Sequence, residues 1–223
     1  MVVAAGADFL ELGIPFSDPL ADGPVIQRAS HTALENGMTV AGALALLREA
    51  RPPVPVIAFS YLNPLLAYGL ERFAAEAAAA GVGGVLVTDL PAGEDPAVET
   101  RFRAAGLDTI RLVAPTSTAT RLEPLLRGAE GFVYLIARLG VTGPRTVVGD
   151  QLAATIARVR AATPLPIAVG FGIAGGEQAR AVAPLADGVV VGSALVERLG
   201  QGMEPARALM AELREALDAG SPG

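Results

Sequence analysis

The sequence predicts an α/β fold, a TIM (β/α)8-type barrel, from three observations. Short apolar runs of strand length alternate with longer Ala-rich runs in which apolar residues recur at helical spacing. The strand runs are apolar on both faces, as in parallel sheets that are covered by helices. The βα unit repeats roughly every 20 to 40 residues, which is typical of a barrel. No Ser/Gly/Pro-rich linker interrupts the 223 residues, so we expect one domain over residues 1–223.

Seven strands are expected where the apolar runs occur. They lie at Phe9–Leu12, Pro55–Ser60, Gly84–Thr88, Thr109–Ala114, Gly131–Ala137, Ile167–Gly170 and Gly188–Val191. Three of them follow a glycine that can end a helix in a left-handed turn, at Gly6, Gly81 and Gly106. Val2–Ala5 has the pattern of a helix end. We therefore expect seven of the eight barrel strands in this chain, with the first βα unit missing.

Amphipathic runs predict the helices that connect these strands. The helices lie at Val25–Asn36, Val40–Arg51, Glu71–Ala80, Pro96–Ala105, Ala119–Leu126, Asp150–Ala162, Gly176–Leu185 and Glu204–Ala219. A short extra helix is expected at Ser193–Arg198, directly after the last strand. A helix between successive strands returns the chain to the same end of the sheet, which makes the strands parallel.

The composition excludes several kinds of catalytic site. The chain has no Cys, its only His is His31, and all 17 basic residues are Arg. Schiff-base chemistry needs a Lys amine, thiolate chemistry needs Cys, and multi-histidine metal sites need a second imidazole. We therefore expect no metal site and no bound organic cofactor, and chemistry by carboxylates, Tyr, Ser/Thr and backbone groups. His31 has no second His at ligand spacing, which favours a packed or solvent-facing role.

The charge pattern indicates the kind of partner that the chain binds. The net charge is −6 and the sequence pI is about 4.9, without a basic stripe, so nucleic acid and anionic membranes are not expected partners. The first ten residues have no positive segment and contain Asp8, unlike a secretory signal. The sequence contains no uninterrupted run of about 18 apolar residues, the length that a membrane-spanning helix needs. A cytoplasmic location is expected.

A carboxylate-rich loop follows the first expected strand. The segment Leu10–Gly23 contains Glu11, Asp18 and Asp22, and Glu11 lies within an apolar strand run. Parallel α/β proteins place their catalytic groups at the carboxyl ends of strands. A carboxylate at the buried end of a strand is neutralised, paired or used in catalysis. The alternative is a strand-end carboxylate that only caps backbone amides of the loop.

Glycine turns follow the last two expected strands. Gly172 lies after one of them and Gly192-Ser193 after the other, and a third turn with Gly143 follows the strand before them. In barrels these loops and the N-terminus of a short helix commonly bind phosphate. Each turn alone is as well explained by loop structure. Together they predict a small phosphorylated substrate, whose reacting end lies near Glu11.

Aromatic residues at or just after strand ends could line that reacting end. They are Tyr61, Tyr134 and Phe171. For Tyr61 and Tyr134 the alternative is a core ring whose hydroxyl is hydrogen-bonded.

Five segments in this order resemble the tryptophan synthase alpha subunit. They are LELGIPFSDPLADGPVIQ (Leu10–Gln27), VTDLP (Val87–Pro91), YLIARLGVTG (Tyr134–Gly143), GFGI (Gly170–Ile173) and VGSALV (Val191–Val196). The resemblance implies a (β/α)8 barrel that cleaves indole-3-glycerol phosphate into indole and glyceraldehyde 3-phosphate in tryptophan biosynthesis, without metal or organic cofactor. It also implies an α2β2 complex, in which a pyridoxal-phosphate beta subunit receives the indole.

The resemblance implies a role for each residue that matches a functional position of the family. Catalysis is implied for Glu11, Asp22 and Tyr134. Phosphate binding is implied for Gly143, Gly172, Gly192 and Ser193. Contact with the indole is implied for Phe59, Tyr61, Leu86, Thr88 and Phe171. Loops that meet the beta subunit are implied for Asp18, Pro19 and Asn63.

The family pattern begins with a helix, a strand and a further helix, roughly 35–40 residues that this chain lacks for a usual barrel length of about 250. Two alternatives to an active lyase follow. One is an inactive shortened chain that only binds or activates the beta subunit. The other is a different phosphate-binding barrel, an isomerase or epimerase, which would share the phosphate end but not the loop of Glu11 and Asp22.

Overall fold

The computed structural model describes residues 1–137, 145–170 and 172–220. Its chain contacts divide into two compact units, one formed by Asp8–Ile110 and the other by Met1–Ala7 together with Arg111–Gly223. Each unit contains one four-stranded sheet, and every strand pairing within the two sheets is parallel. The expectation of a single domain over the whole chain stays a prediction, as does that of a missing first βα unit.

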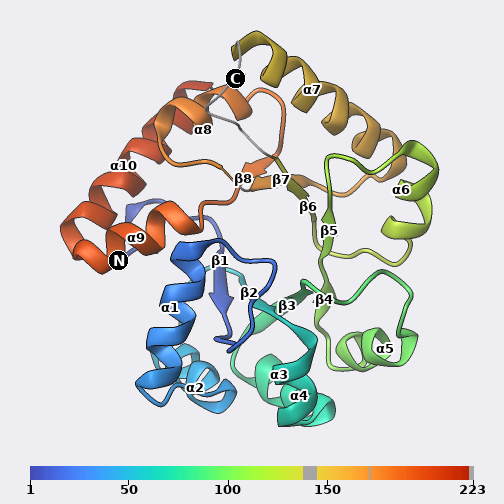
Figure 1. Ribbon diagram of the computed structural model, residues 1–223, viewed down its shortest axis with the longest axis vertical. Coiled ribbons are helices and arrows are strands. Elements are labelled where there is room, and N and C mark those ends of the chain that lie inside the picture. The colour runs from blue at the N-terminus through green and yellow to red at the C-terminus, as the bar shows by residue number, and fades with distance from the viewer. Residues whose placement is uncertain (138–144, 171, 221–223) are drawn as a thin grey trace. The chain divides into compact units, whose positions relative to one another are not determined.

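The unit Asp8–Ile110 contains the sheet β1-β2-β3-β4, with strands in the order of the sequence. The strands are β1 (Leu10–Gly13), β2 (Val56–Ser60), β3 (Val82–Val87) and β4 (Asp108–Thr109). The helices are α1 (Pro24–Glu35), α2 (Val40–Ala50), α3 (Leu62–Tyr68), α4 (Leu70–Ala79) and α5 (Pro96–Ala104). Figure 1 shows α2 to α5 beside this sheet.

Alternation along these strands separates a helix-covered face from an opposite face. Leu10 and Leu12 of β1, with Val56 and Ala58 of β2, contribute to a hydrophobic cluster that includes Phe73 of α4. The residues between them point to the other face. Because the strands are in register, that face presents one row across β1 and β2 and a second row across β1, β2 and β3. The first row is Glu11 and Ile57, and the second is Gly13, Phe59 and Leu86.

Helices α2 and α5 of this unit begin at residues whose side chains accept hydrogen bonds from the first backbone amides of the helix. The Thr39 side chain accepts a hydrogen bond from Gly42 N–H at the start of α2, and Asp95 accepts from Ala97 and Val98 at the start of α5. The start of α3 is capped from elsewhere in the sequence, because Asp89 Oδ1 accepts from Leu62 N–H at 2.7 Å.

The second unit contains the sheet β5-β6-β7-β8. Its strands are β5 (Arg111–Val113), β6 (Val133–Ile136), β7 (Ile167–Gly170) and β8 (Gly188–Val189). Its helices are α6 (Ala119–Leu126), α7 (Arg145–Ala162), α8 (Gly176–Val182), α9 (Ser193–Gln201) and α10 (Met203–Gly220), and a 3-10 turn, η1 (Val3–Ala5), lies near the N-terminus. Val133 and Leu135 of β6 pack with Ile167 and Val169 of β7 in its hydrophobic cluster.

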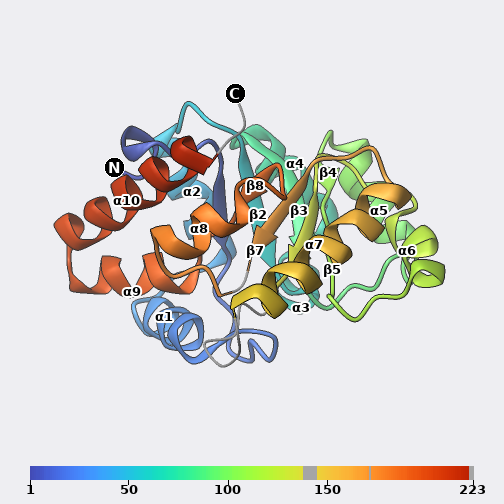
Figure 2. The same ribbon diagram turned by 90° about the horizontal axis from the view of Figure 1, so that it is seen from above.

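The long helix α10 holds several parts of this unit together (Figure 2). It contacts α8, α9 and η1. The Glu212 carboxylate of α10 accepts a hydrogen bond from Gly176 N–H at 2.6 Å and so caps the start of α8. Gly6, with φ of +99°, packs directly against the Arg214 side chain, where a Cβ would lie 2.8 Å from its Cδ.

All seven expected strand runs contain strands, with two differences from the sequence prediction. The run Thr109–Ala114 is interrupted at Ile110, so that β4 and β5 belong to different sheets. The Ile110 N–H donates to Val85 O. Helix α3 was not expected, and Asn63 therefore lies in a helix, not in a loop. Pro64 is compatible with this helix because it lies in the first turn, where its missing N–H has no intrahelical partner.

None of the helices in the described residues is both long and apolar enough to cross a membrane.

Candidate active site

Glu11 presents an unusual carboxylate on the face of the first sheet that the helices do not cover. Its Oε1 is buried and has no hydrogen-bond partner among the described residues. Burial raises the pKa of Glu11 from 4.5 to about 7, because a carboxylate in an apolar environment loses its hydration. Near neutral pH the group can therefore both donate and accept a proton. Because Oε1 has no hydrogen-bond partner among the described residues, it does not cap a backbone amide of the loop there.

Asp22 lies in the loop between β1 and α1 and is tied to Tyr61. The Tyr61 hydroxyl donates to Asp22 Oδ2 at 3.1 Å, and it accepts from Ala21 N–H at 2.9 Å. Gln27 Nε2 donates to the Asp22 carbonyl at 2.9 Å. Burial raises the pKa of Asp22, and the hydrogen bond from Tyr61 opposes part of this rise.

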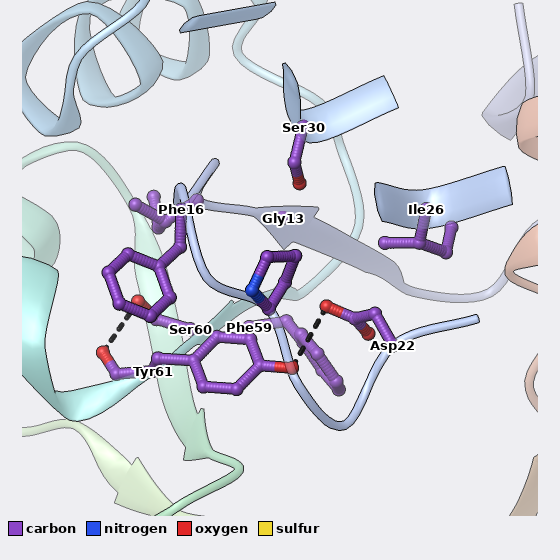
Figure 3. A pocket seen from close by; sticks show the side chains of 10 residues that line it. Gly13, Phe16, Asp22, Ile26, Ser30, Phe59, Ser60 and Tyr61 are labelled. Carbon is purple, nitrogen blue, oxygen red and sulfur yellow. Dashed lines mark hydrogen bonds between the residues drawn. The ribbon is translucent and has the colours of Figure 1, made fainter. Parts of the chain in front are cut away.

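A small hollow with a volume of about 30 Å³ lies beside Asp22 and Tyr61 (Figure 3). This volume is enough for one or two water molecules. The rings of Phe16 and Tyr61 pack at a centroid distance of 5.3 Å along its wall. The lining residues are Gly13, Ile14, Phe16, Pro19, Asp22, Ile26, Ser30, Phe59, Ser60 and Tyr61. Glu11 precedes Gly13 by two residues on the same strand and so points to the same face of the sheet.

The other residues expected to contact indole in this unit share that face. Phe59 and Leu86 pair in register, and Leu86 is fully buried without belonging to the helix-side cluster. Thr88 follows β3, and both its N–H and its hydroxyl donate to Ser60 O. The structure therefore brings Glu11, Phe59, Leu86 and Thr88 to the side of the sheet on which the hollow with Tyr61 and Asp22 lies.

In the second unit, Tyr134 is buried on the face of β6 that points away from the helix-side cluster. It pairs in register with Leu112 of β5 and Ala168 of β7. Its ring lies against Gly170, the last residue of β7, so closely that a Cβ on that glycine would overlap the phenol oxygen. The ring is therefore directed toward the carboxyl end of the strands.

The expected phosphate-binding residues lie at strand ends of the same unit. Gly172 has φ of +93°, a conformation that favours glycine. Gly192 is the N-cap of α9, and Ser193 is its first residue. Both are exposed, and a Cβ on Gly192 would meet nothing within 4 Å. Gly143 and Phe171 lie outside the described residues.

Of the residues expected to meet a partner, Asp18 and Asn63 are exposed, whereas Pro19 is buried. Asp18 accepts a hydrogen bond from the Ser17 hydroxyl, Pro19 lines the hollow, and Leu20 beside it is 91% exposed. Asn63 lies in the first turn of α3. His31 is exposed and pairs with Glu35 one helical turn later, which confirms a solvent-facing role.

Sequence reasoning missed Ile26, Ser30 and Gln27 of α1 as site residues. Their signal is the helical spacing: Ile26 and Ser30 are four residues apart and so share one face of α1, which turns toward the hollow. Within the described residues, no three or more His, Asp or Glu side chains gather as metal ligands.

Comparison with known proteins points to one family over nearly the whole chain. Residues 1–220 match the family model described as "Tryptophan synthase alpha chain". Proteins of that name from Acidiphilium cryptum and Rhizorhabdus wittichii are 50% identical over 206 residues and 48% identical over 223 residues. These alignments cover 91% of this chain and 75% of the first relative, and 97% of this chain and 82% of the second.

Solved structures agree with the sequence relatives. Tryptophan synthase subunit alpha from Legionella pneumophila superposes with a TM-score of 0.87 at 37% identity, over 98% of this chain and 84% of that one. A chain of tryptophan synthase from M. tuberculosis superposes with a TM-score of 0.88 at 36% identity. The superposition covers 97% of this chain and 83% of that one. These similarities confirm the predicted (β/α)8-type fold class.

Proposed function

Since the chain belongs to the family of tryptophan synthase alpha chains, lyases that cleave indole-3-glycerol phosphate to indole and glyceraldehyde 3-phosphate, we propose how its own residues perform this cleavage. The reaction breaks the bond between indole C3 and the glycerol chain. It requires a proton on C3, removal of a proton from the glycerol hydroxyl, and support for positive charge on the indole nitrogen. No cofactor of the alpha chain takes part.

Glu11 moves the protons in this proposal. Its protonated carboxyl donates to C3, and the resulting carboxylate accepts the proton of the glycerol hydroxyl as the carbon–carbon bond breaks and the aldehyde forms. A pKa of about 7 supports this, because general acid–base catalysis is most effective when the pKa of the group lies near the working pH. The observation that carries the proposal is this buried carboxylate oxygen, which lacks a partner among the described residues.

Asp22 stabilises the positive charge. Its carboxylate accepts a hydrogen bond from the indole N–H, which becomes a stronger donor as charge develops on nitrogen in the transition state. Phe59, Tyr61, Leu86, Thr88 and Phe171 enclose the ring, and Tyr134 assists the reacting end. The apolar character of this set would exclude water and strengthen the charged hydrogen bond.

The phosphate is proposed to bind at the start of α9. The backbone amides of Gly192 and Ser193 lie at a helix N-terminus, where the partial positive charge favours an anion. Gly172 and Gly143 would add backbone amides, and Ser193 a hydroxyl. No Lys is needed for such a site.

We further propose an α2β2 complex with a tryptophan synthase beta subunit, in the cytoplasm. Pyridoxal phosphate would belong to the beta subunit. The loop with Asp18 and Pro19 and the first turn of α3 with Asn63 would meet that subunit. The exposed side chain of Leu20 supports this interface, because a partner that covers it removes apolar surface from water, which stabilises the complex.

Indole release from indole-3-glycerol phosphate, measured with a beta subunit present, tests the proposal. Glu11→Gln and Asp22→Asn are expected to lower kcat at least ~100-fold with unchanged circular dichroism. Glu49→Gln, at an exposed position of α2, is the matched control and should keep parental turnover. Near-parental turnover of Glu11→Gln would exclude its role. A parent chain that binds the beta subunit without releasing indole would favour the binding-partner alternative, and isomerase activity the other.

A further inference from the structure

The Tyr61 hydroxyl joins two consecutive residues of one loop, Ala21 and Asp22, and Figure 3 shows its hydrogen bond to Asp22. It is 2.9 Å from the Ala21 nitrogen and 3.1 Å from Asp22 Oδ2. A backbone N–H can only donate, so the phenol oxygen is the acceptor toward Ala21. Its single proton is then left for Asp22. The Thr88 side chain also bonds to the phenol, but the direction toward Asp22 is fixed because an ionised carboxylate can only accept.

Tyr61 is itself held in place. It follows β2 directly as the N-cap of α3, and it is only 5% exposed. Its ring packs against Phe16, which belongs to the same loop as Asp22. A side chain whose rotamer is fixed by packing can hold a partner with little loss of freedom.

The other polar atoms of Asp22 are also engaged, with one exception. Its N–H donates to Pro19 O at 3.0 Å, and its carbonyl accepts from Gln27 Nε2. Its Oδ2 accepts from Tyr61. Within the described residues this leaves Oδ1 as the one polar atom of Asp22 without a partner.

We propose that Tyr61 is a positioning residue, which holds Asp22 through Oδ2 so that Oδ1 is presented to the N–H of the substrate ring. This rests on the role of Asp22 proposed above. It adds a polar function to a residue that the family resemblance places only in the apolar wall around the indole.

The electrostatics of the hollow agree with this role. The lining residues from β1, α1 and β2 bring no titratable group besides Asp22 and Tyr61. Burial raises the pKa of Asp22, and Tyr61 opposes it. The pKa of Tyr61 is raised to about 12, mainly by its own burial, so that the phenol keeps its proton at any working pH. Removal of the hydroxyl would leave the burial of Asp22 unopposed.

The variant Tyr61→Phe tests the proposal because it keeps the ring and removes only the hydroxyl. We expect kcat for indole release to fall about tenfold, as for a lost hydrogen bond to a charged group, with KM within about twofold. The acidic limb of the kcat profile should move to higher pH, because the pKa of Asp22 rises. In the Asp22→Asn background the same change should have little further effect.

Tyr68→Phe is the matched control. Tyr68 lies at the other end of α3, and its hydroxyl donates to Glu76 at 2.8 Å, away from the hollow. This variant should keep the parental kcat and pH profile. A Tyr61→Phe protein with unchanged kcat and pH profile would overturn the proposal, as would a rise in KM alone, which would indicate only an apolar wall.

The pKa of Asp22 can also be followed without turnover, by NMR titration of its 13C-labelled carboxyl group in the folded parent and in Tyr61→Phe. A higher pKa in the variant supports the hydrogen bond that the proposal requires, and an equal pKa overturns it. This readout separates the two hypotheses. A parent chain that releases no indole would refute the proposed function, whereas an unchanged titration refutes the role of Tyr61.

Discussion

A Cβ atom on Gly170 would lie 2.5 Å from Cζ of Tyr134, because the tyrosine ring of β6 packs against the bare backbone at the end of β7. The two residues lie on the face of the sheet opposite the helix-side cluster. The absence of a side chain at Gly170 therefore defines where the Tyr134 ring can lie.

Gly170→Ala is expected to displace the Tyr134 ring and to lower the free energy of unfolding by about 1–3 kcal/mol, as overpacking does. Turnover should fall with it. Gly188→Ala is the control, because a Cβ at Gly188 of β8 would meet its nearest atom, Ala168 Cβ, at an ordinary 3.8 Å. Urea unfolding measures both. Equal stability of the two variants would show that the Tyr134 ring moves freely.

Glu11→Gln is expected to change how stability depends on pH. The raised pKa means that the folded chain binds more protons than the unfolded chain between pH 4.5 and about 7, so ionisation of Glu11 costs stability as the pH rises. At about pH 8 this cost is on the order of 3 kcal/mol, and the neutral amide of Gln avoids it. Denaturant unfolding of parent and variant at about pH 4.5 and pH 8 measures the difference. A difference that does not grow with pH would contradict the buried carboxylate.

The pH profile of kcat/KM should show the proton of Glu11. If the protonated carboxyl starts the cleavage, kcat/KM falls as the pH rises through about 7, up to tenfold per unit. The residual activity of Glu11→Gln should lack this limb, because its amide does not titrate. A parental profile that stays flat from about pH 6 to 9 would assign the proton transfer to another group.

Gly192→Val is expected to weaken binding of the phosphate group. The open space in front of Gly192 leaves room for an anion, which the valine methyl groups would occupy. KM for indole-3-glycerol phosphate should rise roughly tenfold, with similar weakening of inhibition by inorganic phosphate. Gly200→Val, in the same helix with equally open surroundings, is the control. An unchanged KM would exclude the start of α9 as the phosphate site.

Hydrophobic periodicity was sufficient to predict most of the secondary structure. Helix α6 has the predicted bounds because its apolar residues recur at helical spacing, and strand β7 because it is one short continuous apolar run. Helix α3 has only seven residues, and its start is capped by Asp89 from a distant loop, which no local pattern shows. The interruption at Ile110 was equally hidden, because a β-branched residue such as Ile110 is typical of strands and gives no local signal of a break.

Some residues of the candidate site could likewise be predicted from the local sequence, and others could not. Glu11 could be singled out because a charge in an apolar run is visible locally, and Asp22 because it follows in the same carboxylate-rich segment. The hydrogen bond between Tyr61 and Asp22 joins residues 39 positions apart, and the contact of Tyr134 with Gly170 also depends on tertiary packing. Such pairings follow from strand register and rotamers, which the sequence pattern does not specify.

The packing of Gly6 and η1 against α10 sets an order for folding during synthesis. Asp8–Ile110 is one continuous stretch, so its contacts can form while the ribosome is still adding later residues. Met1–Ala7 is synthesised before Asp8–Ile110, yet the helix that receives it, Met203–Gly220, is synthesised after the strands of both sheets. Met1–Ala7 can therefore pack only after Met203–Gly220 has been synthesised, and termination of translation before that helix leaves this segment without its partner.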